Sequence, residues 1–133
     1  MATLSKFDVL TSLGADNRET ASASAWTYSG AAVDLAAYVN PGGRQLKAVL
    51  NVGAITSTGT LNCKIQESTT SAEAGFSDIS GATFAATASS ASLTGSEAIH
   101  FRTNNRYVRA LAVITNTANV DCGVYIVAEK KLV

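Results

Sequence analysis

The side chains that most often carry out catalysis are few in this chain and lie far apart. The only histidine, His100, stands between Ile99 and Phe101 in an alternating segment, on the face opposite to both. A lone histidine at such a position is more often an ordinary surface residue than a general base or a metal ligand. We therefore interpret His100 as a surface residue.

The acidic residues are also scattered. Glycosidase chemistry needs two carboxylates that face each other across a cleft. Glu67 and Asp78 could approach each other across a hairpin, but a chance placement of two acidic residues explains this pair equally well. A zinc site needs three or four ligands at close spacing, and the chain has no such cluster. It also lacks the D-x-D-x-D-G calcium loop, the GxxxxGK[ST] phosphate loop and the GxSxG and GxGxxG motifs. We expect no cofactor, no metal and no enzymatic activity.

Two cysteines, Cys63 and Cys122, lie far apart and form no CxxC pair. Residues 1–13 contain no apolar run of signal-peptide length, so we expect synthesis in a host cytoplasm. In that compartment the two cysteines are expected to be buried free thiols rather than a disulfide. No segment approaches the roughly 20 apolar residues that span a bilayer, so no membrane partner is expected.

The charge balance argues against nucleic acid as a partner. Ten basic and ten acidic residues give a formal net charge of zero, whereas a nucleic-acid site gathers several cations on one face. Arg102, Arg106 and Arg109 are close in sequence, with Tyr107 among them. We interpret them as ordinary solvated strand and turn positions.

Two groups of apolar residues are candidates for contact with a partner protein. Phe7, Leu10 and Leu13 form a weak apolar patch near the N-terminus, and Trp26 and Tyr28 lie two residues apart on one face of an expected strand. If exposed, the two aromatic rings could bind sugar or anchor an interface. If buried, they belong to the core, which the scarcity of other large side chains favours.

The elements that position these residues are short strands. Gly, Ser, Thr and Ala interrupt the chain at short intervals, and apolar and polar residues alternate, most clearly at 45–55 and 60–68. The segment 106–115 is apolar on both faces, which is typical of a central strand. Further strands are expected at 23–29, 76–79, 82–87, 97–103 and 120–128. Residues 31–39 suit a strand by their alternation or a helical turn by their Ala content.

About eight strands in 133 residues predict one all-β domain, an antiparallel two-sheet β-sandwich. Residues 21–133 form this single domain in our interpretation. Residues 1–20 are expected to form an N-terminal arm, as an edge strand, an extended segment or a short helix at 3–13. We expect this arm to lie against another protein subunit.

One segment resembles a known family. The residues at 62–84, NCKIQESTTSAEAGFSDISGATF, are similar to a segment of small phage structural proteins, and R-Y-V-R at 106–109 resembles a strand of the same proteins. The segments at 32–35 and 50–54 also fit, so the resemblance covers roughly residues 30–128.

The resemblance implies a head decoration, or cement, protein: a jelly-roll-like sandwich on the exterior of a phage capsid. Its implied partners are the major capsid protein and further copies of itself, in a homo-oligomer with a trimer favoured and a dimer as the alternative. It implies no catalytic residue. The alternative interpretations are a phage tail or fibre component and a carbohydrate-binding β-sandwich module.

Overall fold

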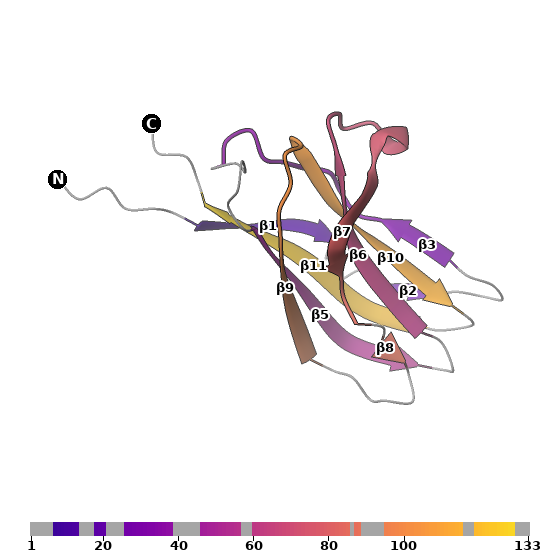
Figure 1. Cartoon of the computed structure of the whole chain (residues 1–133). Helices are drawn as coiled ribbons and strands as arrows, with labels where there is room; N and C mark the ends of the chain where they lie inside the picture. Colours follow the sequence, from indigo (N-terminus) through magenta and orange to yellow (C-terminus); the bar gives the residue numbers. More distant parts are fainter. Residues whose placement is uncertain are drawn as a thin grey trace.

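The chain folds into two antiparallel sheets that pack face to face (Figure 1). The computed structural model describes residues 7–13, 18–20, 26–38, 46–56, 60–85, 87–88, 95–115 and 119–129. Sheet A contains β1 (Phe7–Leu13), β2 (Arg18–Thr20), β5 (Leu46–Thr56), β9 (Gly95–Phe101) and β11 (Asn119–Glu129). Sheet B contains β3 (Trp26–Ser29), β4 (Val33–Asp34), β6 (Thr60–Ser68), β7 (Ser77–Thr83), β8 (Thr87–Ala88) and β10 (Tyr107–Thr115). The predicted all-β sandwich is confirmed.

The strand order is that of a jelly roll. Sheet A runs β1-β11-β5-β9 and sheet B runs β3-β10-β6-β7, with the short strands β2, β4 and β8 beside these paths. When the eight principal strands are numbered along the chain, the two sheets read 1-8-3-6 and 2-7-4-5. Successive principal strands alternate between the sheets, except β6 and β7, which are neighbours in sheet B. This is the double Greek-key pattern of an eight-stranded jelly roll.

The core lies between the sheets and is made from alternating positions, because successive strand residues point to opposite faces. The inward positions predicted for 45–55, 60–68 and 120–128 are confirmed. The buried residues from these strands are Leu46, Ala48, Leu50, Val52, Leu61, Cys63, Ile65, Cys122, Val124, Ile126 and Ala128. Neither cysteine forms a disulfide, as expected.

The predicted central strand is also confirmed. β10 pairs with β6 on one side and with β3 and β4 on the other, and Val108, Ala110 and Ala112 are buried in the core. Its alternate residues face the outside of sheet B.

Two segments differ from the sequence interpretation in extent. Of the alternatives for 31–39, a strand forms only at Val33–Asp34 in the described residues 31–38, because the Asp34 carboxylate accepts a hydrogen bond from the Ala36 amide and turns the chain. The segments 76–79 and 82–87, expected as two strands around a turn, instead contribute to one strand, β7. Between the pairs Gln66–Asp78 and Lys64–Thr83 the register shifts, with residues 79–82 of β7 opposite Ile65 alone, and Gly81 has φ 81°. The residues expected to turn therefore form a large bulge within the strand.

Residues 7–13 and 18–20 form strands that pair with β11, so they belong to sheet A. The sequence placed the start of the sandwich after residue 20, but the ladder of sheet A already contains Phe7. Of the alternatives for residues 1–20, an edge strand is what β1 forms, and the described part of 3–13 is not helical. The cause is long-range pairing, which overrides the weak helical spacing of Phe7, Leu10 and Leu13.

Candidate protein-binding surfaces

The five candidate contact residues lie on two edge strands. Phe7, Leu10 and Leu13 belong to β1, and Trp26 and Tyr28 belong to β3, where their backbones pair with Ile114 and Ala112 of β10. The Leu10 side chain is half-buried and packs against the core. The side chains of the other four lie outside the described residues.

A loop of the chain covers the part of the outer face of sheet B around Arg109. The connection from β6 to β7 contains the short helical turn η1 (Glu73–Gly75), seen as the coiled ribbon at one end of the sandwich in Figure 1. This loop lies over β6 and β10, where Arg109 points outward from β10. Arg109 is only 6% exposed, which corrects its interpretation as a solvated position.

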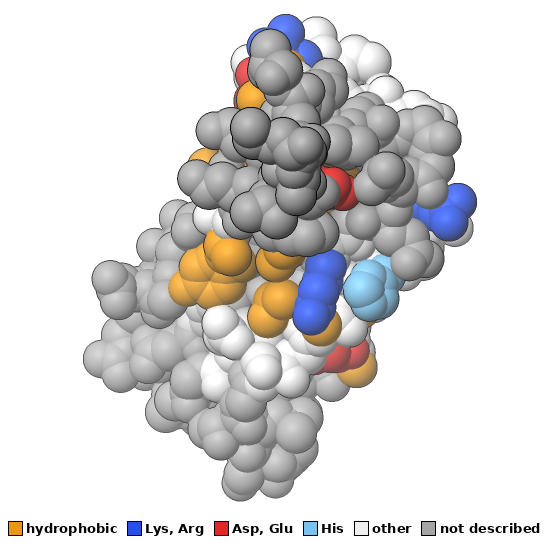
Figure 2. Space-filling view, turned by 90° about the vertical axis from the view of Figure 1, so that its left-hand side faces the viewer, with side chains coloured by type: hydrophobic (Ala, Val, Ile, Leu, Met, Phe, Trp, Pro, Cys, Tyr) orange, Lys and Arg blue, Asp and Glu red, His pale blue; other side chains and the backbone are white. Residues whose placement is uncertain are grey.

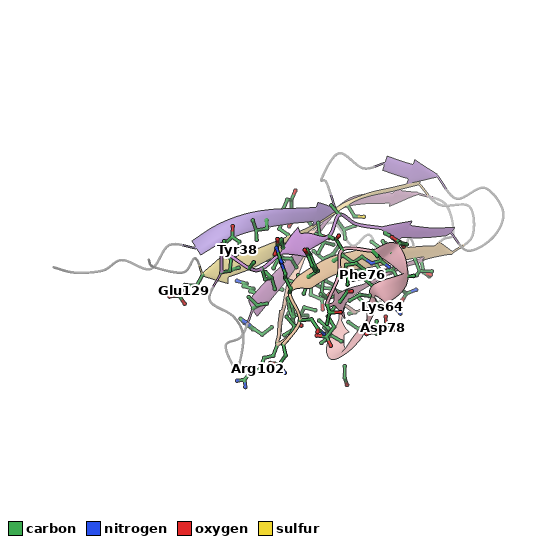
Figure 3. All side chains as sticks on the ribbon, turned by 90° about the horizontal axis from the view of Figure 1, so that it is seen from above. Tyr38, Lys64, Phe76, Asp78, Arg102 and Glu129 are labelled. Carbon is green, nitrogen blue, oxygen red and sulfur yellow. The ribbon has the colours of Figure 1, made fainter. Side chains whose placement is uncertain are left out.

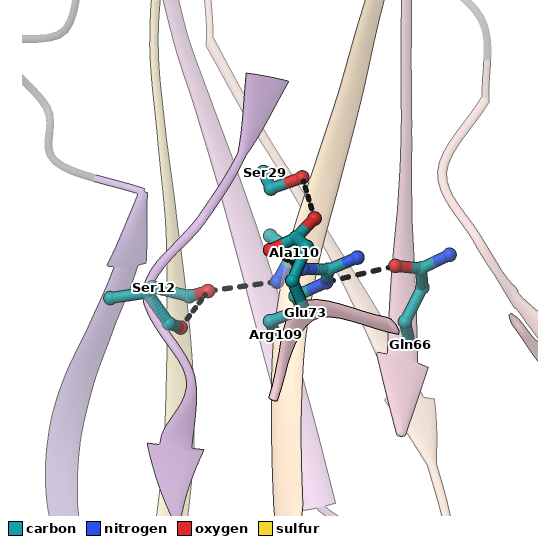
Figure 4. A network of polar contacts seen from close by, with 7 residues as sticks. Ser12, Ser29, Gln66, Glu73, Arg109 and Ala110 are labelled. Atoms are coloured by element: carbon teal, nitrogen blue, oxygen red, sulfur yellow. Dashed lines mark hydrogen bonds and ion pairs between the residues drawn. The ribbon is translucent and has the colours of Figure 1, made fainter. Parts of the chain in front are cut away.

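Arg109 is held by three partners, two of which, Gln66 and Glu73, are drawn in Figure 4. Its Nε donates to Oε1 of Gln66 at 2.9 Å, its Nη1 donates to Oε2 of Glu73 at 2.6 Å, and its guanidinium lies over the Phe76 ring, 4.3 Å from the centroid. The hydrogen bond from Arg109, and a second one from the Ser29 hydroxyl, lower the pKa of Glu73. Arg109 therefore ties η1 to β10 and β6, while the Ser29 hydroxyl ties η1 to β3 through Glu73. We name this group the Arg109 network.

The other arginines and lysines of this region are paired or isolated. Arg106 binds both carboxylate oxygens of Asp34, at 2.9 and 2.8 Å. These hydrogen bonds, together with one that the Ala36 amide donates to Asp34, lower the pKa of Asp34 to about 2. Lys64 binds Asp78 at 2.6 Å on the outside of the sandwich (Figure 3). Two of the three basic groups thus face a carboxylate, while Arg102 lies exposed beyond β9.

The two sheets are joined at one side through Ser12 (Figure 4). Its hydroxyl accepts a hydrogen bond from the Ala110 amide at 2.8 Å and donates one to the Ala31 carbonyl at 2.9 Å. Gly30 runs so close that a Cβ atom there would lie 2.6 Å from the Ser12 hydroxyl. The edge of β1 is therefore closed against sheet B.

The outer face of sheet A carries apolar residues in two neighbouring cross-strand rows. Because Val124, Ile126 and Ala128 point into the core, Tyr125 and Val127 point outward. Tyr125 pairs with Val49, which pairs with Ala98, and Val127 pairs with Val9. We name these five residues, Val9, Val49, Ala98, Tyr125 and Val127, the outer patch of sheet A.

The outer patch is open to solvent on the described surface. Val9 is 65% exposed, Ala98 is exposed, and the other three side chains are half-buried. Lys47 and His100 form the next cross-strand pair beside it. Figure 2 shows hydrophobic side chains gathered next to a basic residue and the histidine. The sequence could have predicted this patch, since Val49, Tyr125 and Val127 occupy the outward positions in the alternation of β5 and β11. The sequence interpretation selected the aromatic residues of β3 instead.

No catalytic arrangement is brought together within the described residues. His100 is exposed, as expected. Glu67 accepts a hydrogen bond from Thr103 while Asp78 binds Lys64 and Gln66, so the two carboxylates considered for a hairpin have different partners. No group of three His, Cys, Asp or Glu in the described part could hold a metal ion, and no described helix has the length and apolar character needed to cross a membrane.

The fold has a counterpart among solved structures. The chain is similar to the SPBc2 prophage-derived protein YomS, with a TM-score of 0.52 and 14% identity over 98% of each chain. It is also aligned with PirA, at 14% identity over 85% of this chain and 91% of PirA, but with a TM-score of 0.36, which does not indicate a shared fold. No protein-family model matches the chain, and no curated protein matches it. The likeness to YomS shows the fold.

Proposed function

We propose that this chain is a non-enzymatic structural protein of a phage particle that binds the outside of the assembled capsid and stabilises it. The observation that carries the proposal is the outer patch of sheet A. An antiparallel sheet with one solvated face normally places polar residues there, whereas Val9, Val49, Tyr125 and Val127 occupy it here. Such a surface suits a protein that ends in an assembly.

Two further observations support a phage particle. The segments at 62–84 and 106–109 resemble those of head decoration proteins, and the solved structure with the shared jelly-roll fold is a prophage-derived protein. A capsid repeats each binding position many times, so a modest contact per subunit is sufficient once copies of the protein are linked. The major capsid protein is the proposed partner, and the capsid exterior is the proposed location.

The test is a binding experiment with heads from the encoding phage that lack this protein. Purified protein is added, the heads are sedimented, and the bound fraction is measured together with the temperature at which the heads release DNA. Val9→Lys is the informative variant because its side chain is largely solvated in the free protein. Burial of a valine contributes about 1.5 kcal/mol or more, so its loss should weaken binding at least about tenfold.

Ser80→Lys is the matched control, since it adds the same charge at an exposed position of sheet B. It should bind as the unchanged protein does. If the unchanged protein does not bind the heads, or if both variants bind equally well, the proposal is wrong. Gold-labelled antibody on intact virions separates the locations, because label over the tail would assign the protein to the tail instead.

A further inference from the structure

Strand β9 differs from the other three sheet edges of the sandwich. β1 is closed by Ser12, and its register against β11 shifts near Thr11. On sheet B, β3 and β4 are only four and two residues long, and β7 carries the bulge at Gly81. Short, bulged or covered edges are the devices by which proteins prevent pairing with other chains.

β9 is neither short nor bulged within the described residues, and its one inward-pointing charge, Glu97, accepts hydrogen bonds from the Ala85 amide beyond β7. β9 runs seven residues, Gly95–Phe101, in an unbroken register with β5, which is its one ladder partner in the described part of the chain. Its sequence, GSEAIHF, contains no proline and no lysine. The outward residues Ser96, Ala98 and His100 are all exposed. An edge of this kind presents backbone donors and acceptors to an added strand.

We propose that β9 pairs with β9 of a second copy of this chain, antiparallel and around a two-fold axis at Ala98. Ala98 is the middle residue of β9, so this register pairs all seven residues, and any other pairs fewer. Ala98 then faces Ala98 of the second copy, and Ser96 faces His100. This pairing goes beyond capsid binding and does not depend on it.

The charges of the strand favour the same register. With the axis at Ala98, Glu97 faces Ile99, and the imidazole of His100 faces a hydroxyl, so no charge opposes its like. A register centred on Glu97 would place two carboxylates directly opposite each other, which is destabilising. The formal net charge of zero adds no long-range repulsion between copies.

The pairing also continues the outer patch across the axis. In one molecule the row runs from Tyr125 through Val49 to Ala98. In the pair, Ala98 meets Ala98 and the row continues through Val49 and Tyr125 of the second copy. Eight principal strands, four from each copy, then form one sheet with a continuous apolar row on its outer face. An isolated copy contains only half of this row.

Cysteine cross-linking of the isolated protein tests the register. Directly opposed residues have Cβ atoms about 4.5–5.5 Å apart, within reach of a disulfide after small adjustments. Ala98→Cys should therefore give a covalent dimer under mild oxidation. Ser96→Cys is the matched control, because two copies of residue 96 would lie four residues apart along the strand, about 13 Å, and should stay uncoupled. The native Cys63 and Cys122 are buried and should not interfere.

Sedimentation over a concentration series gives the second readout. The unchanged protein should associate to a dimer, and Ala98→Lys, which places two like charges at the axis, should shift the equilibrium to monomer. Ser80→Lys should leave the dimer intact. Equal cross-linking of the two cysteine variants, a trimer, or a protein that stays monomeric throughout the series would overturn the pairing. None of these results involves phage heads, so they leave the capsid proposal untouched.

Discussion

Replacing Arg109 by alanine is the most direct perturbation of the surface that covers sheet B. Arg109 is buried and is the central member of its network, with Gln66, Glu73 and Phe76 as partners. Removal of its side chain leaves Oε1 of Gln66 without its donor in a buried position. It also removes the stacking contact that holds Phe76 over β10.

The magnitude follows from those two losses. A buried acceptor left without a partner costs about 1–3 kcal/mol, and loss of a guanidinium from an aromatic ring costs about 0.5–2 kcal/mol. Glu73 is 75% exposed and returns to water at little cost. We therefore expect Arg109→Ala to lower the free energy of unfolding by about 1.5–5 kcal/mol. At roughly 4 °C per kcal/mol for a domain of this size, the melting temperature should fall by about 6–20 °C.

Two assays check the expectation separately. Urea unfolding gives the free energy, and a protease that cleaves after glutamate reports on the loop through cutting after Glu73, identified by mass spectrometry. Arg109→Ala should be cut there faster than the unchanged protein, because η1 loses its attachment. Arg109→Lys should be intermediate, since a single ammonium cannot contact Gln66 and Glu73 in the fixed geometry of a guanidinium.

Arg102→Ala is the control, because it removes the same charge from an exposed position. A surface change of this kind should alter stability by no more than about 0.5 kcal/mol. If Arg109→Ala matches Arg102→Ala in both stability and cleavage, the Arg109 network does not order the loop, and this account of sheet B is refuted.

Three further predictions address other parts of the sandwich. Ser12→Ala should lower the free energy of unfolding by about 1–3 kcal/mol, measured in urea, because it leaves the buried Ala110 amide without an acceptor; no change would mean that the hydroxyl does not join the sheets. Arg106 lowers the pKa of Asp34 from 3.8 to about 2, so the stability that this shift contributes is present above about pH 4 and is lost as the pH falls toward 2. Asp34→Asn should flatten stability against pH in that window, and an unchanged slope would contradict the assignment. Burial raises the pKa of the Cys63 thiol, so Cys63 and Cys122 should react with a thiol reagent only after unfolding; reaction of the native protein on mixing would show that these thiols are accessible.

The parts of the fold that could be predicted are those in which the local pattern and the tertiary environment agree. In β5, β6 and β11 one face is buried and the other is not, so apolar and polar residues alternate along the sequence with the two-residue period of a strand. The central position of β10 could be predicted because apolar residues occupy both of its faces. No such pattern distinguishes a turn from a bulge at Ser80-Gly81, where glycine suits both, and only the pairing with β6 decides.

The Arg109 network could not be predicted for a different reason. Its members come from β3, β6, the loop and β10, and Arg109 lies 36 residues from Glu73 and 43 from Gln66. The sequence shows an arginine on the outward side of a strand, which normally means solvent. Whether a loop from elsewhere in the chain covers that position depends on the topology. The outer patch of sheet A differs from the Arg109 network in this respect. Its residues follow the alternation of β5 and β11, so the sequence alone could have predicted them.

The two sheets therefore differ in what lies on their outer faces, and this difference connects the two proposals. Around Arg109, sheet B is covered by its own loop, whereas sheet A presents its outer patch beside β9, an edge strand of seven residues with an unbroken register. A β9 pair joins two such patches into one, so each dimer would offer a capsid two linked contacts rather than one. Ala98→Lys lies at the axis, and Val9→Lys lies at the far edge of the sheet. If both proposals hold, Ala98→Lys should weaken head binding by dissociating the pair, whereas Val9→Lys should weaken it while the dimer persists in sedimentation.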